Sequence, residues 1–311
     1  MANYLTIDGG TTNTRISLVL SGKIADNISL GIGVKANTEG NVFYKQKIKD
    51  GIRDILSSNS VSEEDIKIIL CSGMITSKMG LCELEHLSTP CGINELKNGI
   101  FETEMPEISK IPFAFVRGVK TGTDSYDTAD MMRGEETELM GLGEKLESSC
   151  LYVLPGSHSK LILTDENECI CSFSTALTGE LIDAVANNTI LKESIDLKNS
   201  VLNEDYLIKG FECAKKAGID AAFFKVRTLK NLFSASSDEV YSFFLGVALC
   251  DEIKEIIASA ARSVIIGGKP QLKIPTAILL RKYSDKQIIC ADESVCKYAP
   301  TYGIIKIYEY N

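Results

Sequence analysis

Short apolar runs that end in glycine and hydroxyl residues recur along the chain. The first run, Leu5–Ile7, is followed after a polar loop by a second run, Ile16–Leu20. Apolar runs of this length bounded by turn residues are typical of buried strands. The pattern therefore predicts a strand, a tight loop and a second strand. The loop between them consists of Asp8, Gly9, Gly10, Thr11, Thr12 and Asn13.

This loop has the chemistry of a phosphate-binding turn. Two glycines leave the backbone free to adopt positive φ, so its N–H groups can close around an anion. The hydroxyls of Thr11 and Thr12 add donors, and the carboxylate of Asp8 can hold a hydrated Mg²⁺. The loop is not a Walker loop, because it has no lysine and a strand follows it. An ordinary Gly-Gly hairpin with a capping aspartate is the alternative.

The second half of the chain repeats this plan. A strand at Leu151–Leu154 leads into a polar glycine loop, a second strand at Lys160–Thr164 and a third at Cys169–Phe173. The loop residues are Gly156, Ser157, His158 and Ser159. We therefore predict two similar α/β domains at residues 1–142 and 143–311, with a lid or small excursion at about 81–112.

Other periodic segments complete the predicted secondary structure. We expect helices at residues 41–57, 134–141, 175–191, 202–217, 238–261 and 302–311. A buried strand at 65–72 ends in Gly73 and Met74, and a strand at 263–266 ends in Gly267 and Gly268. Loops at the carboxyl ends of parallel strands are where α/β sheets place ligands. Plain strand-end turns are the alternative at both places.

Composition narrows the class of protein. The chain has 311 residues, a net charge of -9 and no basic cluster, which argues against nucleic acid as a partner. We expect no membrane segment and a cytoplasmic location. The ten cysteines lack the spacing of a disulfide framework. Cys169 and Cys171 lie at strand spacing, and we interpret them as buried free thiols rather than a metal or redox pair.

Several separated motifs together resemble the 2-dehydro-3-deoxygalactonokinase family of the actin-like ATPase and sugar-kinase superfamily. These motifs are the stretches 8–15, 132–139, 152–160, 178–181 and 244–246. The resemblance implies two actin-like, ribonuclease H-like domains with mixed sheets, flanking helices and a nucleotide cleft between them. It also implies ATP and Mg²⁺ as cofactors, with Asp8 as the metal ligand.

The same resemblance implies the reaction and its substrate. The expected activity is phosphorylation of the 6-hydroxyl of 2-dehydro-3-deoxy-D-galactonate, a small-molecule sugar acid. The chain departs from the family where Gly9 replaces tryptophan and where Leu161 replaces an aromatic residue. A kinase for another sugar or small acid and a non-metabolic actin-like ATPase are the alternative functions. As an assembly we predict a homodimer.

The resemblance assigns candidate roles to individual residues. Glu135 is the candidate general base, because related sugar kinases carry a catalytic carboxylate at the corresponding helix start; Arg133 is the second catalytic candidate. A carboxylate that only favours the first helix turn is the alternative for Glu135 and for Glu136, and an ion pair with these acids is the alternative for Arg133. For His158 the alternative is a turn residue, and for Lys160 a solvated edge residue.

The remaining candidates bind the nucleotide and the sugar acid. The candidates for nucleotide binding are Asp8, Gly9, Gly10, Thr11, Thr12, Asn13, Gly156, Ser157, His158, Ser159, Lys160, Gly267 and Gly268, with the last two on the adenine side. The candidates for substrate binding are Gly73, Met74, Arg133, Thr178, Gly179 and Glu180.

Overall fold

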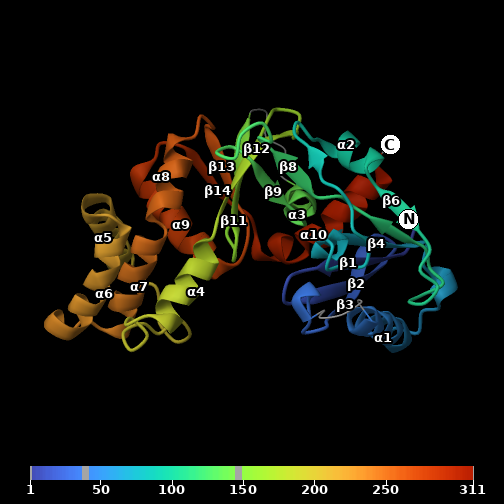
Figure 1. Cartoon of the computed structure of the whole chain (residues 1–311), viewed down its shortest axis with the longest axis horizontal. Helices are drawn as coiled ribbons and strands as arrows, with labels where there is room; N and C mark the ends of the chain where they lie inside the picture. Colours follow the sequence, from blue (N-terminus) through green and yellow to red (C-terminus); the bar gives the residue numbers. More distant parts are fainter. Residues whose placement is uncertain (1, 37–41, 144–148, 311) are drawn as a thin grey trace. The chain divides into compact units, whose positions relative to one another are not determined.

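The computed structural model describes residues 2–36, 42–143 and 149–310. The chain forms two compact units, both of mixed α/β structure (Figure 1). The first unit contains Met1–Lys145, Asn167–Ser172 and Ser294–Asn311, and the second contains Leu146–Glu166 and Phe173–Glu293. This grouping differs from the expected boundaries in two segments, since 167–172 and 294–311 belong with the first unit.

A six-stranded mixed sheet forms the centre of the first unit, in the order β3-β2-β1-β4-β7-β6. β1 pairs antiparallel with β2 and parallel with β4, so Gly9 at the end of β1 lies opposite Gly73 at the end of β4. The strands are β1 (Tyr4–Gly9), β2 (Thr14–Leu20), β3 (Lys23–Ser29), β4 (Ile68–Gly73), β6 (Phe101–Thr103) and β7 (Phe113–Phe115).

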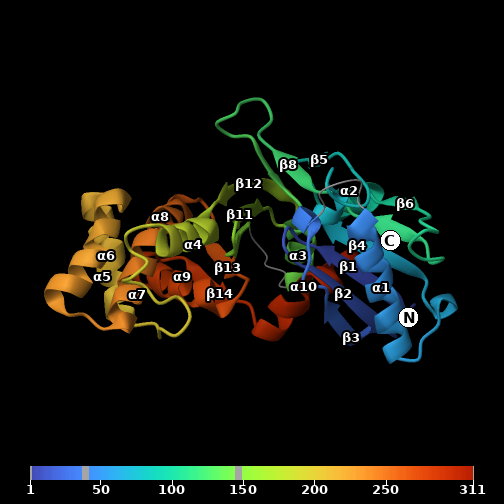
Figure 2. The ribbon, with the colours of Figure 1, turned by 60° about the horizontal axis from the view of Figure 1, so that its bottom comes forward.

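Helices cover both faces of this sheet. Leu5 and Ile7 of β1 pack in the core under α1 (Val42–Ser58), which lies along the sheet in Figure 2. Thr6 points the other way and contacts Thr301 of α10 (Glu293–Glu309) at 3.3 Å. Because side chains alternate along a strand, Asp8 shares the α10 face with Thr6. The predicted start of the first helix, Asn41, lies outside the described residues.

The expected excursion at 81–112 is built into this unit. It contributes β5 (Leu87–Ser88), α2 (Ile93–Asn98) and β6, which is the edge strand of the six-stranded sheet. A second, three-stranded sheet has the order β5-β8-β9. The remaining elements are β8 (Val119–Thr121), β9 (Asp130–Met132), α3 (Glu135–Leu142) and the short 3-10 helices η1 (Val34–Ala36), η2 (Glu63–Asp65) and η3 (Met74–Thr76).

The second unit repeats the same sheet topology with five strands, in the order β12-β11-β10-β13-β14. β10 pairs antiparallel with β11 and parallel with β13, as β1 does with β2 and β4. The repeat that the sequence predicted is therefore confirmed at the level of strand order. The strands are β10 (Cys150–Leu154), β11 (Ser159–Thr164), β12 (Ile170–Ala176), β13 (Ser263–Ile266) and β14 (Gln287–Cys290).

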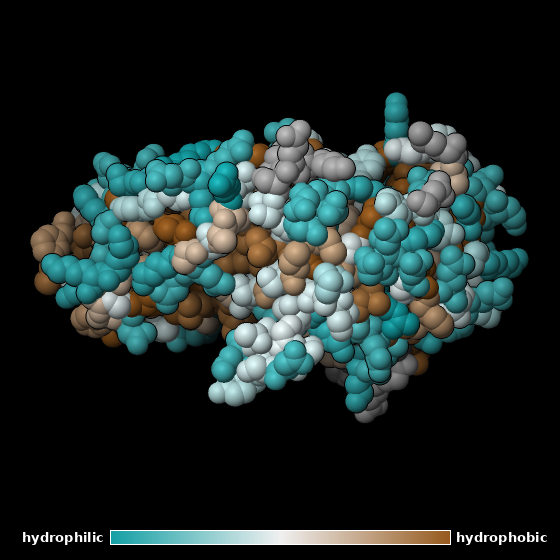
Figure 3. Space-filling model, turned by 90° about the horizontal axis from the view of Figure 1, so that it is seen from above, coloured by the Kyte–Doolittle hydropathy of each residue, from teal (hydrophilic) through white to brown (hydrophobic). Residues whose placement is uncertain are grey.

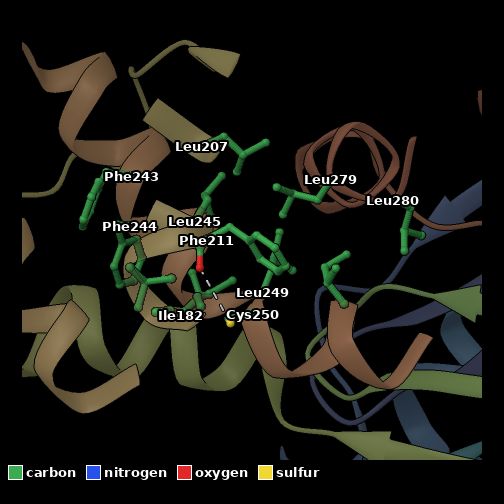
Figure 4. Packing of buried hydrophobic residues seen from close by; sticks show 14 of the residues in the cluster. Ile182, Leu207, Phe211, Phe243, Phe244, Leu245, Leu249, Cys250, Leu279 and Leu280 are labelled. Carbon is green, nitrogen blue, oxygen red and sulfur yellow. Dashed lines mark hydrogen bonds between the residues drawn. The ribbon is translucent and has the colours of Figure 1, made fainter. Parts of the chain in front are cut away.

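The helices of the second unit bury a large apolar core. Figure 4 shows Phe211, Phe244 and Leu279 from three of these helices converging in it. The segment predicted as one helix at 238–261 forms two helices, which separate at Leu249. The helices are α4 (Thr178–Asn188), α5 (Glu204–Ala217), α6 (Ile219–Phe233), α7 (Ser237–Ala248), α8 (Cys250–Ala258) and α9 (Pro270–Tyr283).

The composition bears on the exposed surface and on the state of the cysteines. Hydrophilic side chains cover much of the face shown in Figure 3, with apolar groups between them. Among the described residues no helix has both the length and the apolar character needed to span a membrane. None of the ten cysteines, which all lie in the described part of the chain, forms a disulfide bond. The interpretation of Cys169 and Cys171 as buried was wrong, since Cys169 is half-buried and Cys171 is exposed.

Candidate functional site

The first glycine loop is closed by its own backbone. The N–H of Gly10 donates to the carbonyl of Asn13 at 2.8 Å. The side-chain Oδ1 of Asn13 accepts from the Ser29 hydroxyl at 2.7 Å and from the Gly31 N–H at 3.1 Å. The loop between β1 and β2 is thus tied to the end of β3. A loop held in this way presents its backbone with little freedom, which favours anion binding.

Gly9 has no room for a side chain. A Cβ at this position would lie 2.7 Å from the Ile75 Cβ and 3.1 Å from the Tyr44 hydroxyl. The Tyr44 hydroxyl also shares a hydrogen bond of 3.0 Å with the buried Thr14 hydroxyl. This packing requires glycine at position 9. Sequence reasoning missed Tyr44, which lies 30 residues from its partner.

Three segments that are distant in the sequence meet beside Asp8. A Cβ on Gly73 would lie 3.3 Å from the Asp8 Oδ1 and 2.7 Å from the Gly9 carbonyl oxygen. A Cβ on Gly134 would lie 3.2 Å from the Gly73 Cα. The ends of β1 and β4 and the start of α3 therefore converge on one point. The structure brings together the predicted residues Asp8, Gly73 and Glu135 of the first unit.

The carboxyl groups at this point influence each other. Burial raises the pKa of Asp8, nearby Glu135 raises it further, and Arg15 opposes the shift. Arg15 Nη1 lies 3.8 Å from Asp8 Oδ2. Burial and the charges of Glu135 and Asp8 also raise the pKa of Glu138 to about 7. We did not single out Glu138 from the sequence, although its i,i+3 spacing from Glu135 was a usable signal.

Glu136 has a different environment from Glu135. Its side chain is buried, and both carboxyl oxygens accept from the Gly134 N–H at 2.9 Å. Burial and the charge of Glu135 raise the pKa of Glu136 to about 8. Glu135, in contrast, is partly exposed and its Oε2 accepts from the Arg133 backbone N–H at 3.0 Å. The two neighbouring acids therefore do not share one role.

The Arg133 guanidinium is held inside the first unit. Nη1 donates to the Thr76 hydroxyl at 2.7 Å and Nη2 to the Leu84 carbonyl at 2.5 Å. His86 Nδ1 lies 3.4 Å from Nη2. Burial, followed by the charges of Arg133 and Lys120, lowers the pKa of His86 to about 4. These hydrogen bonds tie Arg133 to η3, which begins at Met74, and to the segment at Leu84.

The second glycine loop packs against the start of α4. The Gly179 N–H donates to the Gly156 carbonyl at 3.1 Å, and the Glu180 N–H donates to the Ser157 carbonyl at 3.2 Å. A Cβ on Gly179 would lie 2.5 Å from the Gly156 oxygen, so glycine is required for this approach. The predicted segments 156–160 and 178–180 therefore form one structure.

The side chains of His158 and Lys160 make polar contacts at this second loop. His158 Nε2 lies 3.3 Å from Glu180 Oε1. Lys160 is buried, and its Nζ donates to the His158 carbonyl at 3.3 Å. Lys160 is therefore not the solvated edge residue that was its alternative interpretation. Glu180 and Lys160 both follow the turn in the sequence, and their side chains contact His158 within it.

The glycine pair after β13 lies next to the same loop. The Gly267 N–H donates to the Val153 carbonyl at 2.9 Å. Gly268 has a φ of 73°, and a Cβ there would lie 2.7 Å from the Pro155 carbonyl oxygen. Pro155 immediately precedes Gly156. All predicted binding residues of the second unit thus gather at the carboxyl ends of β10 and β13.

The side chains around Asp8 fit a Mg²⁺ ion that takes few of its ligands from the protein. Among the described residues no group of three or more His, Cys, Asp or Glu side chains is arranged to hold a metal ion. Mg²⁺ bound with a nucleotide usually takes one or two carboxylates and completes its shell with water and phosphate oxygens. The single carboxylate of Asp8, beside a polar glycine loop, is compatible with that form of binding.

Comparison of the chain with known proteins places it in a family of sugar-acid kinases. The family described as 2-keto-3-deoxy-galactonokinase matches residues 8–297. The chain belongs to this family, and its motifs had indicated the same assignment. The match covers both glycine loops, α3 and the start of α4.

Two curated relatives carry the same family name. A Rhizobium meliloti (strain 1021) protein assigned as a 2-dehydro-3-deoxygalactonokinase is 28% identical over 197 residues, which are 62% of this chain and 59% of that protein. The chain thus matches less than two thirds of that relative's length. The 2-dehydro-3-deoxygalactonokinase of Escherichia coli (strain K12) is 26% identical over 254 residues, covering 81% of this chain and 80% of that protein.

Solved structures share the fold. A crystal structure from Sinorhizobium meliloti, assigned as a 2-dehydro-3-deoxygalactonokinase, has a TM-score of 0.79 at 21% identity and covers 98% of this chain and 99% of that one. The activator of the 2-hydroxyisocaproyl-CoA dehydratase from Clostridium difficile, solved with bound ADPNP, has a TM-score of 0.52 at 12% identity and covers 99% and 95%. The predicted actin-like fold is confirmed.

Proposed function

We propose that this protein is an ATP-dependent sugar-acid kinase that phosphorylates the 6-hydroxyl of 2-dehydro-3-deoxy-D-galactonate. The observation that carries the proposal is the position of Glu135. It begins α3 next to the carboxylate of Asp8, in a chain that belongs to the 2-keto-3-deoxy-galactonokinase family. A phosphoryl transferase needs groups that hold phosphates and a base that orients the acceptor hydroxyl.

The two glycine loops are the proposed phosphate-binding elements. Residues 9–13 in the first unit and 156–159 in the second each offer backbone N–H groups and hydroxyls in a loop held by neighbouring strands. Asp8 would hold Mg²⁺, which when bound neutralises charge on the phosphates. Gly267 and Gly268 would accept the adenine side of the nucleotide, since absent side chains leave backbone accessible.

Glu135 is the proposed general base. It is partly exposed, and its Oε2 is oriented by the Arg133 backbone N–H. A carboxylate held in this way can accept the proton of the attacking hydroxyl. Gly73, Met74 and the 178–180 segment are the proposed contacts for the sugar acid. Arg133 would act here by fixing η3 through Thr76.

A coupled assay of ADP release tests the proposal. The purified protein is given ATP, Mg²⁺ and one acceptor at a time from a panel of 2-keto-3-deoxy sugar acids and common sugars. Rapid ADP release with 2-dehydro-3-deoxy-D-galactonate, and a 6-phosphate product by mass spectrometry, is the expected result. If only a different sugar supports turnover, that sugar replaces 2-dehydro-3-deoxy-D-galactonate as the proposed substrate. Slow ATP hydrolysis that no acceptor accelerates would favour an actin-like ATPase. The homodimer and the cytoplasmic location stay predictions.

A further inference from the structure

A buried carboxyl group lies behind the second glycine loop. Glu252 is in the first turn of α8, and the residue is only 5% exposed. Its Oε2 accepts a hydrogen bond from the hydroxyl of Thr178, the first residue of α4. Nothing in the sequence motifs singles out this residue, which is 74 positions from its partner.

The same carboxyl group reaches the other half of the loop. The Ser159 hydroxyl also hydrogen-bonds Glu252. Ser159 is buried at the start of β11, and its Oγ accepts from the Gly156 N–H at 3.4 Å. One side chain therefore ties together the end of the 156–159 hairpin and the start of α4. These are the two segments that the Gly179 and Glu180 N–H groups already join.

The helix that carries Glu252 is fixed in the core. Leu249, Cys250, Ile253 and Ile256 are buried in the apolar cluster of the second unit. Figure 4 shows Leu249 and Cys250 within this packing, with the Cys250 thiol directed at the Phe211 carbonyl. Side chains on such an element have little freedom to shift. The position of the Glu252 carboxyl is thus set by the core and not by the loop.

A buried carboxyl group at this position costs desolvation free energy that packing alone does not require. Burial raises the pKa of Glu252, and the hydrogen bonds from Thr178 and Ser159 oppose that shift. Glu252 Oε1 is buried without a hydrogen-bond partner in the described part of the chain. An apolar side chain of similar volume would avoid this desolvation cost. What the carboxyl group adds is the orientation of two hydroxyl-bearing segments.

We propose that Glu252 is a positioning residue for nucleotide binding. By holding Ser159 and Thr178, it keeps the 156–159 hairpin and the start of α4 in the shape that binds phosphate. Glu252 acts through these residues and does not itself contact the nucleotide. The inference rests on the proposed function, because it assigns the second loop to phosphate.

Direct nucleotide binding tests this role without the sugar acid. Mg·ADP affinity is measured by calorimetry for the full chain, for Glu252→Ala and for Glu252→Gln. Loss of two hydrogen bonds should weaken Mg·ADP binding by about 10- to 100-fold in Glu252→Ala. Glu252→Gln should stay within about threefold, because its amide oxygen can accept from Thr178. In turnover assays, KM for ATP should rise more than KM for the acceptor.

The matched control is Glu255→Ala, which removes an exposed acid one turn further along α8. It should leave Mg·ADP affinity unchanged. A folded Glu252→Ala variant that binds Mg·ADP as tightly as the unsubstituted protein overturns the inference and leaves the proposed function intact. If that variant does not fold, Thr178→Val removes the same hydrogen bond, and unchanged affinity in it has the same meaning. An unsubstituted protein that binds no adenine nucleotide overturns both proposals.

Discussion

Gly73 lies directly against Asp8: a Cβ on Gly73 would be 3.3 Å from the Asp8 Oδ1. The backbone of Gly73 has φ 82° and ψ -154°, a region that is essentially restricted to glycine. Strand β4 therefore ends in a residue that lets the backbone turn and leaves space beside the carboxylate. The close approach of β4 to Asp8 explains why a turn glycine is also a site residue.

Gly73→Ala should damage both stability and metal use. The strained backbone should lower the free energy of unfolding by about 1–3 kcal/mol, measured by urea denaturation. The added methyl group should displace Asp8 and raise the Mg²⁺ concentration needed for turnover. Gly31→Ala is the control, since Gly31 also has a positive φ of 64° but nothing within 4 Å of an added Cβ. An equal Mg²⁺ requirement in both variants would contradict the assignment of Asp8 as the Mg²⁺ ligand.

Glu135→Gln should lower kcat by about 10²- to 10⁴-fold, because the amide cannot accept the acceptor hydroxyl's proton. Mg·ADP affinity should stay nearly unchanged, since the substitution preserves size. Steady-state kinetics and calorimetry measure the two quantities. Glu136→Gln is the comparison, because that buried neighbour bonds to Gly134 and has another environment. If Glu135→Gln keeps half of the turnover of the unsubstituted protein, another group is the general base.

Glu136 should make stability depend on pH. Its pKa is raised from an ordinary 4.5 to about 8 in the folded protein. Between these values the folded chain keeps a proton that the unfolded chain has released, so the free energy of unfolding falls as pH rises from 4.5 to 8. Glu136→Gln resembles the protonated form and should flatten this slope in thermal unfolding curves. A slope identical to that of the unsubstituted protein would refute the assignment to Glu136.

Gly179→Ala tests the contact between α4 and the second loop. Its Cβ would lie 2.5 Å from the Gly156 oxygen and 2.8 Å from the Ser157 Cα, so backbone must move. Overpacking of this kind costs about 1–3 kcal/mol of unfolding free energy, and KM for ATP should rise. Gly156→Ala is the matched change for stability, since nothing lies within 4 Å of its added Cβ. Equal destabilisation of both variants would argue against a structural role for the contact between Gly179 and Gly156.

The sequence by itself determined the local features of this protein. Both glycine loops were predicted because a strand, a turn and a second strand are encoded by neighbouring residues. The repeated succession of strand, glycine loop and strand followed from the same local signals, and Glu135 was found at a helix start that glycine precedes. The family resemblance added roles to these residues. All of these features depend on short stretches of chain, where residue type and spacing carry the information.

The tertiary structure alone decided which distant residues share a site. Asp8, Gly73 and Gly134 meet because β1, β4 and α3 end at one place, and no local pattern encodes that convergence. Tyr44 and Glu252 were missed for the same reason, since each acts on a loop through a side chain from another helix. Burial also separated the roles of Glu135 and Glu136. Desolvation depends on packing around a group, and a sequence does not display that packing.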